Sequence, residues 1–391
     1  MAKSASKREP AKRQRTTVAV GCQGGGMHAA FEVGVLTEIL RDVGQNRFTL
    51  VGLSGTSAGA LNALMVWYGL APKNGSPGSV ADAISNLEEF WHDFVASTNA
   101  SNILNFLTYN AMRAQETEVL GISVPAFGLN PFGAIYKAVA ATLPSLGVRQ
   151  QYFDLEHILH KACPHFGRID WQQVKTKLLI GASEVVNGLE TVFDSDVNKG
   201  TQAKHVGYWR QRLPLTLSGV AASGTLPIFR EAQRIEGAHY WDGLYSQNPP
   251  VREFLASAND VPDELWIIRI NPQQWPEVPQ TNADIQDRQN ELMGNLSLHK
   301  ELDFILKVNE WHDRYKNERF GKEHKPVIVR TIMMKEKTAD ALRYSSKFNR
   351  SRDFMQQLRA EGREVARNWL DRWRNGSIGC YPDDAAYRSF R

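Results

Sequence analysis

The chain has 391 residues, with 46 Lys or Arg and 42 Asp or Glu, so its formal net charge is +4. Hydrophobic residues make up 42% of it and aromatic residues 10%, which excludes an intrinsically disordered protein and allows one large domain or two smaller ones. The three cysteines, Cys22, Cys163 and Cys380, are far apart, which excludes a disulfide framework and favours a reducing compartment.

The excess of basic residues lies at the N-terminus. The first seventeen residues hold six Lys or Arg and one Glu, a charge of +5, so the rest of the chain is close to −1. We predict that residues 1–16 form a disordered tail, and no secretory signal, because no apolar segment follows the charges. Two interpretations of this tail stay open: a solvated segment, or one that contacts anionic lipid. We expect no specific nucleic-acid partner.

Strands and helices alternate in the first part of the chain. Apolar patterns predict strands at Thr17–Gln23 and Phe48–Ser54, and helices at Ala29–Asp42 and Ala58–Tyr68. This order predicts an α/β fold with three layers, in which a mostly parallel central sheet carries helices on both faces. No apolar run reaches the roughly 18–20 residues of a membrane span, so we expect a cytoplasmic protein, peripheral at a membrane surface at most.

Residues 71–150 interrupt this alternation and predict a helical insertion. The segments NLEEFWHDFV, NILNFLTYNAM and NPFGAIYKAVAATL look like amphipathic helices between Gly- and Pro-rich loops. Their apolar side chains fit either an ordinary core or a cap that faces lipid. The residues concerned are Phe90, Trp91, Phe94, Phe106, Leu107 and Tyr109.

Strands resume at Lys177–Ala182, Glu190–Asp194, Glu264–Ile270 and Val327–Met334. A last helix is predicted at Ser351–Trp373, with one apolar stripe and one basic stripe. The basic stripe consists of Arg352, Arg359, Arg363 and Arg367. It could meet a membrane surface, but acidic residues in the same helix favour a solvated face.

The segment Gly55-Thr56-Ser57-Ala58-Gly59 fits the pattern G-x-S-x-G, between a predicted strand and a predicted helix. A serine at such an elbow is strained, so Gly55 and Gly59 are needed as small neighbours. The helix that begins at Ala58 directs N–H groups and the positive end of its dipole toward Ser57. This context predicts an exposed nucleophile.

A second glycine cluster, Gly24-Gly25-Gly26, follows the first strand. Read as Gly24-x-Gly26-x-x-Ala29, it fits a dinucleotide-binding fingerprint, but the second strand ends without the acidic residue that would hold the ribose. Bare backbone N–H groups instead suit an oxyanion hole. Turns after adjacent parallel strands lie at the same sheet edge, so these donors and Ser57 should converge.

A serine nucleophile needs a base. The chain has ten histidines, and His299, His312 and His324 follow Ser57 in a chain order that a triad could use, although their surroundings are highly charged. The segment His239-Tyr240-Trp241-Asp242-Gly243-Leu244 offers an aspartate at a turn.

Taken together, three segments resemble the signature blocks of patatin-like phospholipases, in the same order. They are GGGMHAAFEVGVL, GLSGTSAGALNAL and YWDGLYSQNPP, and the stretches AASGTLPIFR and LLIGASEVVNGLETVF agree with them. The resemblance covers about residues 17–272, which we take as the catalytic domain. Residues 273–391 are then a C-terminal extension whose further strand and helices complete the fold.

The resemblance implies a lipid acyl hydrolase with a Ser–Asp dyad and no metal or organic cofactor. Ser57 would be the nucleophile and Asp242 its base, supported by Gly243. The amides of Gly24, Gly25, Gly26 and Ala58 would hold the oxyanion. The substrate would be a phospholipid or related lipid at a membrane surface, cleaved through an acyl-serine intermediate; no oligomeric state is implied.

The sequence departs from the family pattern where His28 and Ala29 stand in place of the usual Lys or Arg and Gly. A histidine is only partly charged near neutral pH, so a headgroup contact by His28 and simple packing both stay open. Two other functions also stay open. One is an esterase with a Ser–His–Asp triad that uses His239 or a later histidine, and the other is a non-catalytic nucleotide- or membrane-binding module.

Overall fold

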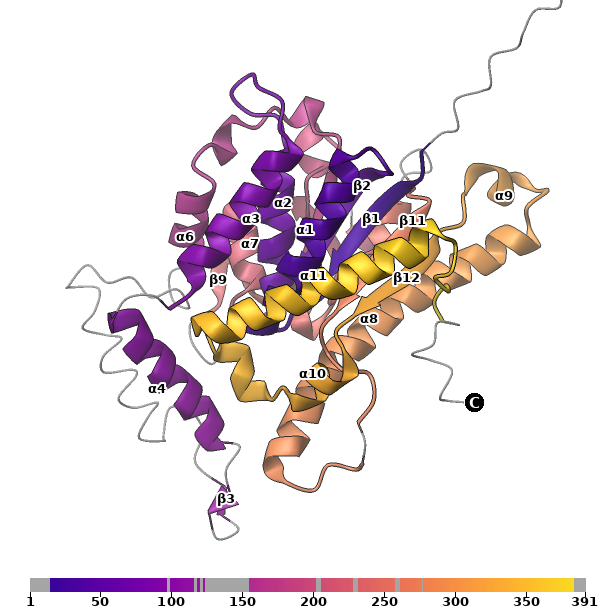
Figure 1. Ribbon diagram of the computed structural model, residues 1–391. Helices are drawn as coiled ribbons and strands as arrows, with labels where there is room; N and C mark the ends of the chain where they lie inside the picture. Colours follow the sequence, from indigo (N-terminus) through magenta and orange to yellow (C-terminus); the bar gives the residue numbers. More distant parts are fainter. Residues whose placement is uncertain are drawn as a thin grey trace, which may run out of the picture.

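The computed structural model describes residues 15–96, 99–115, 118–119, 122–123, 155–201, 205–227, 231–256, 261–275 and 277–382 (Figure 1). The predicted tail lies almost entirely outside these residues, as does the third predicted insertion helix at residues 130–143. In the described part of the chain, no helix is both long and apolar enough to cross a bilayer.

The strands are β1 (Thr17–Cys22), β2 (Thr49–Thr56), β3 (Glu118–Val119), β4 (Ile122–Ser123), β5 (Lys177–Glu184), β6 (Glu190–Asp194), β7 (His205–Gly207), β8 (Arg210–Pro214), β9 (Gln233–Ile235), β10 (Ala238–Asp242), β11 (Glu264–Arg269) and β12 (Ile328–Met333). The α-helices are α1 (Ala30–Gly44), α2 (Ala58–Leu70), α3 (Val80–Phe94), α4 (Asn99–Gln115), α6 (Leu155–Ala162), α7 (Leu217–Ser223), α8 (Asn282–Arg314), α9 (Arg319–Glu323), α10 (Glu336–Ala341) and α11 (Arg352–Arg374). Short 3₁₀ turns relevant to the site are η1 (Gly26–Ala29), η6 (Gly243–Tyr245), η7 (Arg252–Leu255) and η8 (Tyr344–Phe348).

The central sheet has the strand order β12-β11-β1-β2-β5-β6-β8-β7, and β10 joins it by pairing with β5 and β9. The strands from β12 to β5 are all parallel. β6 is antiparallel to β5 and parallel to β8. The predicted mostly parallel α/β sheet is therefore confirmed, with antiparallel strands at one side.

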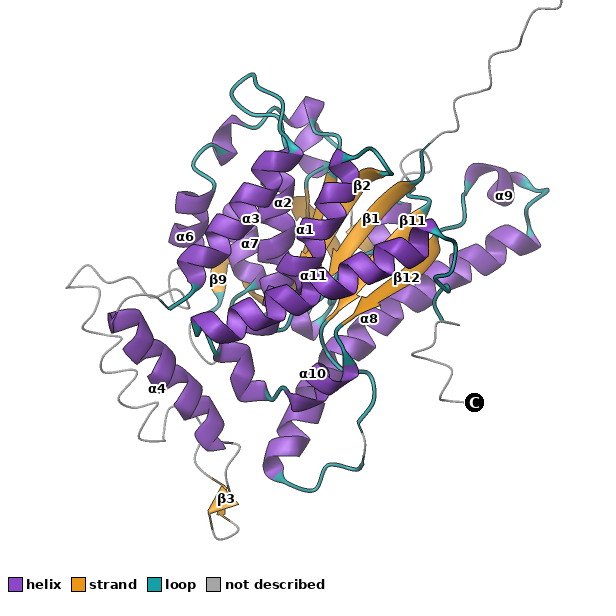
Figure 2. Ribbon diagram, in the orientation of Figure 1, coloured by secondary structure: helices purple, strands orange, loops and turns teal. Residues whose placement is uncertain are grey.

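Side chains that alternate along each strand separate two cores, one on each face of the sheet. On β1, Val18 and Val20 face the larger core, whereas Ala19 faces the smaller one. α1, α2, α3 and α11 cover the larger core, and α8 covers the smaller one through Leu298, Leu302 and Ile305 (Figure 2). Helices on both faces, as predicted, make this a three-layer structure.

The helices of the predicted insertion differ in their exposure. Phe90, Trp91 and Phe94 of α3 are buried in the larger core, so for them the core interpretation holds. On α4, Ile103 and Phe106 are 55% and 58% exposed. The amphipathic pattern alone did not distinguish these two helices, because it shows an apolar face without its partner.

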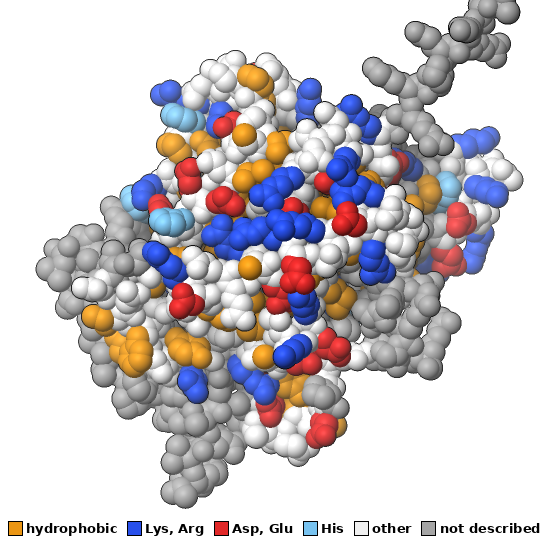
Figure 3. Space-filling view, in the orientation of Figure 1, with side chains coloured by type: hydrophobic (Ala, Val, Ile, Leu, Met, Phe, Trp, Pro, Cys, Tyr) orange, Lys and Arg blue, Asp and Glu red, His pale blue; other side chains and the backbone are white. Residues whose placement is uncertain are grey.

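The segment that follows residue 272 contributes β12 to the sheet and α11 to the helical layer over α1 (Figure 1). The basic stripe of α11 meets acidic side chains of neighbouring helices: Arg367 lies 3.0 Å from Glu38, and Arg359 lies 3.7 Å from Glu88. Lys and Arg side chains gather along this face in Figure 3. Because acids on α1 and α3 oppose these arginines, the solvated-face interpretation fits α11 better than a membrane contact.

A buried polar network ties the first three helices together around Asn62 on α2. Its side-chain nitrogen donates to the Ala29 carbonyl oxygen at 3.0 Å and to a Glu32 carboxylate oxygen at 2.8 Å. Its side-chain oxygen accepts from the Trp91 indole N–H at 2.5 Å. Burial raises the pKa of Glu32 well above its ordinary value, and the bond from Asn62 opposes that rise.

We expect Asn62→Ala to lower the free energy of unfolding by about 2–4 kcal/mol, because it leaves the Trp91 donor and the Glu32 carboxyl buried without this partner. Urea denaturation followed by circular dichroism measures this change. Asn110→Ala, which removes only an exposed bond to the Phe106 carbonyl oxygen, is the matched control and should change stability by less than about 0.5 kcal/mol. Equal losses in both variants would contradict a structural role for the network.

Candidate active site

Ser57 lies at the sharp turn between β2 and α2. Its backbone angles are φ 55° and ψ −127°, a conformation that non-glycine residues rarely adopt. A Cβ on Gly55 would collide with the backbone of Gly59, and one on Gly59 would collide with the Cys22 carbonyl oxygen. Both glycines are thus required by close approach, as the G-x-S-x-G pattern predicts. Ala58 is the first residue of α2.

β5 brings Asp242 next to this turn. Along one edge of β5, Gly181 is paired with Thr56 of β2, and the next residue, Ala182, is paired with Asp242 of β10. β10 therefore pairs with the same edge of β5 as β2, beginning where β2 ends at Thr56. Gly243 follows at the start of η6, where a Cβ would collide with the Gly181 carbonyl oxygen. The two residues predicted as nucleophile and base thus meet, although 185 positions of sequence separate them.

The Asp242 carboxyl is fully buried. Its Oδ1 accepts a hydrogen bond from the Leu244 N–H at 2.8 Å, and its Oδ2 makes no hydrogen bond of normal geometry with the described residues. Burial raises the pKa of Asp242 to about 7, although the Ser57 hydroxyl and the Leu244 N–H favour the ionised form. An aspartate with this pKa is a far stronger base than an exposed one.

Ser223, at the end of α7, holds the backbone of Ser57. Its hydroxyl accepts from the Ser57 N–H at 2.9 Å and donates to the Gly181 carbonyl oxygen at 2.6 Å. Two residues later, the Thr225 carbonyl oxygen accepts from the Asp242 N–H at 2.9 Å. One short segment therefore positions both the turn of Ser57 and the end of β10.

The turn of Gly24 to Gly26 lies beside Ser57, as predicted, but its three amides are not equivalent. A Cβ on Gly24 would lie 2.9 Å from the Ser57 Cβ. The Gly24 N–H donates to the Asn248 side-chain oxygen at 2.5 Å. In this structure that amide is therefore not free for a substrate oxygen, unlike the role that the family resemblance implies for it. The amides of Gly25, Gly26 and Ala58 donate to none of the described residues.

His28 lies in η1 and is only 3% exposed. Its Nε2 lies 2.7 Å from the Ser346 hydroxyl, in η8. Burial and the nearby Lys347 ammonium lower the pKa of His28 well below its ordinary value, so the ring is neutral at neutral pH. Of the two interpretations that the sequence left open, this arrangement favours packing, because a headgroup contact would require η8 to move away from the ring.

The histidines considered for a triad lie elsewhere. His239 precedes Asp242 by three positions on β10, so strand alternation places its side chain on the opposite face. His299 lies on α8, and His324 stacks on Phe320. Within the described ranges, no histidine hydrogen-bonds to Ser57 or Asp242. The same part of the chain contains no cluster of three His, Cys, Asp or Glu side chains that could hold a metal ion.

Comparison with known protein families places the chain. The family model described as Patatin-like phospholipase matches residues 22–255. The chain belongs to the patatin-like phospholipase family. Membership of this family supports a lipid hydrolase function. No curated protein sequence matches the chain.

Two solved structures align with most of this patatin-like chain at low similarity. VipD from Legionella pneumophila is 12% identical, with 89% of this chain and 67% of VipD covered and a TM-score of 0.34. ExoU from the type III secretion system of Pseudomonas aeruginosa, solved with SpcU, is 14% identical, with 91% and 53% covered and a TM-score of 0.28. At these values neither structure supports a conclusion about substrate or partner, and this chain corresponds to only part of each.

Sequence reasoning missed the roles of Ser223 and Asn248. Both lie in segments that resemble patatin-like blocks, AASGTLPIFR and YWDGLYSQNPP. A short polar residue next to small residues in such a block indicates that its side chain hydrogen-bonds to the backbone of the site. The partner of each bond lies more than 150 residues away, so the pattern could not name it.

We expect Ser223→Ala to slow covalent labelling of Ser57 by a fluorophosphonate by roughly 10- to 100-fold, because the strained backbone loses the bond that orients it. Labelling rates measured by intact-protein mass spectrometry test this. Ser223→Thr, which keeps a hydroxyl, should recover part of the rate. Ser218→Ala on the same helix, whose hydroxyl bonds to Glu156, is the control and should label at the parent rate. An unchanged labelling rate in Ser223→Ala would show that Ser223 does not position Ser57.

Proposed function

We propose that this protein is a serine lipid acyl hydrolase that cleaves carboxylic ester bonds of phospholipids or related lipids with a Ser57–Asp242 dyad. One observation carries the proposal. A buried aspartate with a pKa of about 7 ends the strand that lies directly beyond the strained turn of Ser57. An ionised Asp242 at that place can accept the proton of the serine hydroxyl.

Acylation and deacylation then use the same two side chains. The Ser57 oxygen attacks the ester carbonyl carbon while Asp242 accepts its proton. The tetrahedral intermediate collapses with cleavage of the ester C–O bond, and Asp242 returns the proton to the departing alcohol. A water molecule, deprotonated by Asp242, attacks the acyl-serine, and the carboxylic acid leaves as Ser57 recovers its proton.

The negative charge of each tetrahedral intermediate needs donors beside Ser57. The amides of Gly25, Gly26 and Ala58 are the candidates, because Asn248 already occupies the Gly24 amide. The Asn248 bond instead fixes the turn that carries the other donors. The N-terminal end of α2 adds a favourable partial positive charge at the same place.

We expect Ser57→Ala and Asp242→Asn each to reduce hydrolysis by at least roughly 10³-fold, because each removes one member of the dyad. The assay uses a soluble p-nitrophenyl ester and phosphatidylcholine in mixed micelles, and the ratio of the two activities reports any preference for phospholipid. His239→Gln and His299→Gln serve as controls and should retain activity. Full activity of Asp242→Asn, or loss in a histidine variant, would favour the triad.

The raised pKa of Asp242 predicts the pH dependence. Asp242 acts as a base only when ionised, so kcat/KM for the p-nitrophenyl ester should fall about tenfold per unit as the pH drops below about 7 and should level off above it. The profile is measured between pH 5 and 9 at constant ionic strength. An acid limb centred near pH 4, where an exposed aspartate titrates, would show that burial does not govern the base.

A further inference from the structure

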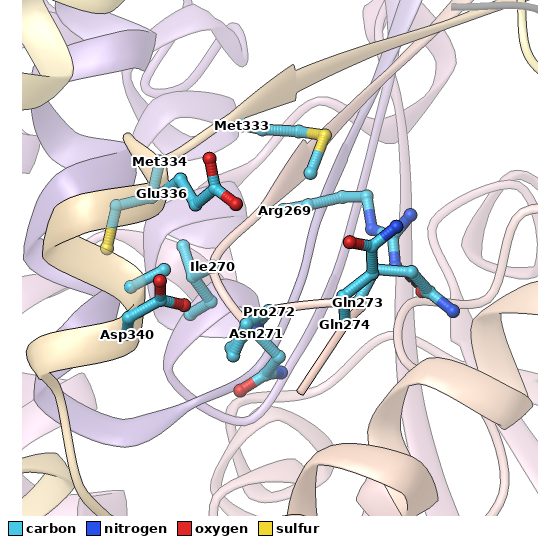
Figure 4. Close-up of a pocket in the computed structure, with 11 residues that line it drawn as sticks. Arg269, Ile270, Asn271, Pro272, Gln273, Gln274, Met333, Met334, Glu336 and Asp340 are labelled. Atoms are coloured by element: carbon cyan, nitrogen blue, oxygen red, sulfur yellow. Dashed lines mark hydrogen bonds between the residues drawn. The ribbon is translucent and has the colours of Figure 1, made fainter. Parts of the chain in front are cut away.

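A cavity of about 360 Å³ lies at the carboxyl edge of β11 and β12, beside the candidate active site (Figure 4). Ser57 follows β2 and the glycine turn follows β1, so all of these groups share one edge of the parallel strands. Crevices at this edge of a parallel sheet are the usual ligand sites of open α/β folds, and this volume is within the range of small-molecule pockets. The glycine turn separates the cavity from Ser57.

Asn271 joins the cavity to that turn. It lines the cavity, and its side-chain nitrogen donates to the Gly24 carbonyl oxygen at 3.1 Å. Its side-chain oxygen would lie 3.5 Å, an ordinary van der Waals distance, from a Cβ atom placed on Gly25. The residue is 4% exposed, and this oxygen has no hydrogen-bond partner among the described residues. A buried acceptor without a partner calls for a donor, which a ligand in the cavity can supply.

Two carboxylates supply further unpaired acceptors. Glu336 and Asp340 line the cavity from α10, four positions apart, so they lie on one face of the helix and repel each other. In the described part of the chain neither makes an ion pair or a hydrogen bond. Lys335, the cation next to them, is directed to Glu364 at 2.8 Å. Figure 4 shows both carboxylates on one side of the cavity, with Gln273 and Gln274 on the other.

The remaining wall favours an apolar body. Ile270, Met334 and Ala339 are at most 9% exposed and line the cavity. The Arg269 guanidinium, also in the wall, hydrogen-bonds to the side-chain oxygens of Gln273 and Asn295, so it is directed away from α10. Figure 4 shows the Arg269 guanidinium on the side of Gln273, across the cavity from the two carboxylates of α10.

We propose that this cavity binds the ammonium group of an organic amine, with the carbon body against Ile270 and Met334. Glu336 and Asp340 neutralise the charge, and Asn271 accepts a hydrogen bond and links an occupied cavity to the glycine turn. The amine comes either from a free amphipathic amine or from the headgroup of a lipid. The site does not depend on hydrolysis at Ser57, so it stands apart from the proposed reaction.

Binding is measured by titration calorimetry on full-length Ser57→Ala protein, which prevents turnover. The probes are n-hexylammonium, n-hexanol and hexanoate, which share one carbon body and differ in charge. We expect hexylammonium to bind at least roughly tenfold more tightly than the other two, and less tightly at high salt. Equal binding of the three probes would overturn the proposal.

Variants test whether hexylammonium binds in this cavity or is only attracted by the net charge of the protein. The double variant Glu336→Gln, Asp340→Asn should weaken hexylammonium binding by roughly 5- to 20-fold, because two exposed carboxylates lose their charge. Ala339→Phe fills the cavity and should abolish binding, whereas Ala341→Phe on the same short helix is outside the wall and is its control. Asp313→Asn, an exposed acid on α8, controls for net charge. Unchanged binding in the double variant, even if Ala339→Phe fails to fold, would overturn the proposal.

The two sources of the amine are distinguished with detergent micelles. Micelles that contain phosphatidylethanolamine should bind in a way that depends on Glu336 and Asp340 if the headgroup occupies the cavity, and phosphatidylglycerol micelles should not. Binding of free hexylammonium without this lipid dependence would assign the cavity to a free amine. Lipid binding that is equal for both headgroups and unchanged in the double variant would show that the lipid headgroup does not occupy the cavity.

Discussion

The pairing of β5 on its two edges is the constraint on which the candidate site depends. β6 occupies one edge of β5 as far as Ser183, and β2 occupies the other only as far as Gly181. β10 therefore pairs on the edge that β2 leaves, and it places Asp242 opposite Ala182. A register shift of one residue would turn the Asp242 side chain to the other face of the sheet. Backbone pairing, rather than attraction between the two side chains, brings Ser57 and Asp242 together.

The backbone of Ser57 is strained, and neighbouring contacts hold it in that conformation. A residue held in such a backbone conformation costs on the order of 1–3 kcal/mol, which the surroundings must offset. The Ser223 bond to the Ser57 N–H and the contact between Gly55 and Gly59 do so without a bulky side chain near the hydroxyl. The Ser57 side chain is half-buried, and the contacts that support it come from backbone atoms and the small Ser223 side chain.

Buried charge fixes the loop that follows Asp242. Arg210 of β8 lies 2.7 Å from Glu253 and 2.9 Å from Glu301 of α8, and Glu301 also accepts the Val251 N–H at 2.9 Å. Such a cluster gains little net stability, because desolvation offsets the attraction between the charges. Its consequence is positional. It anchors the segment that carries Asn248, whose side chain in turn holds the Gly24 amide.

The sequence alone determined the α/β class, six strands of the central sheet and the elbow of Ser57, because these depend on local apolar periodicity and on glycine spacing. The place of Asp242 came from the resemblance of its segment to a family block. β6 was predicted with the bounds that the structure shows, Glu190–Asp194. The sequence did not predict α8, because its 33 residues are mostly polar and show no apolar periodicity. It also did not predict that η8 packs over His28, because no local pattern indicates that contact. The tertiary structure decided which glycine amide is free, how Ser57 is held and how strongly Asp242 is buried. Each of these depends on contacts between distant segments, and local residue patterns do not encode such contacts.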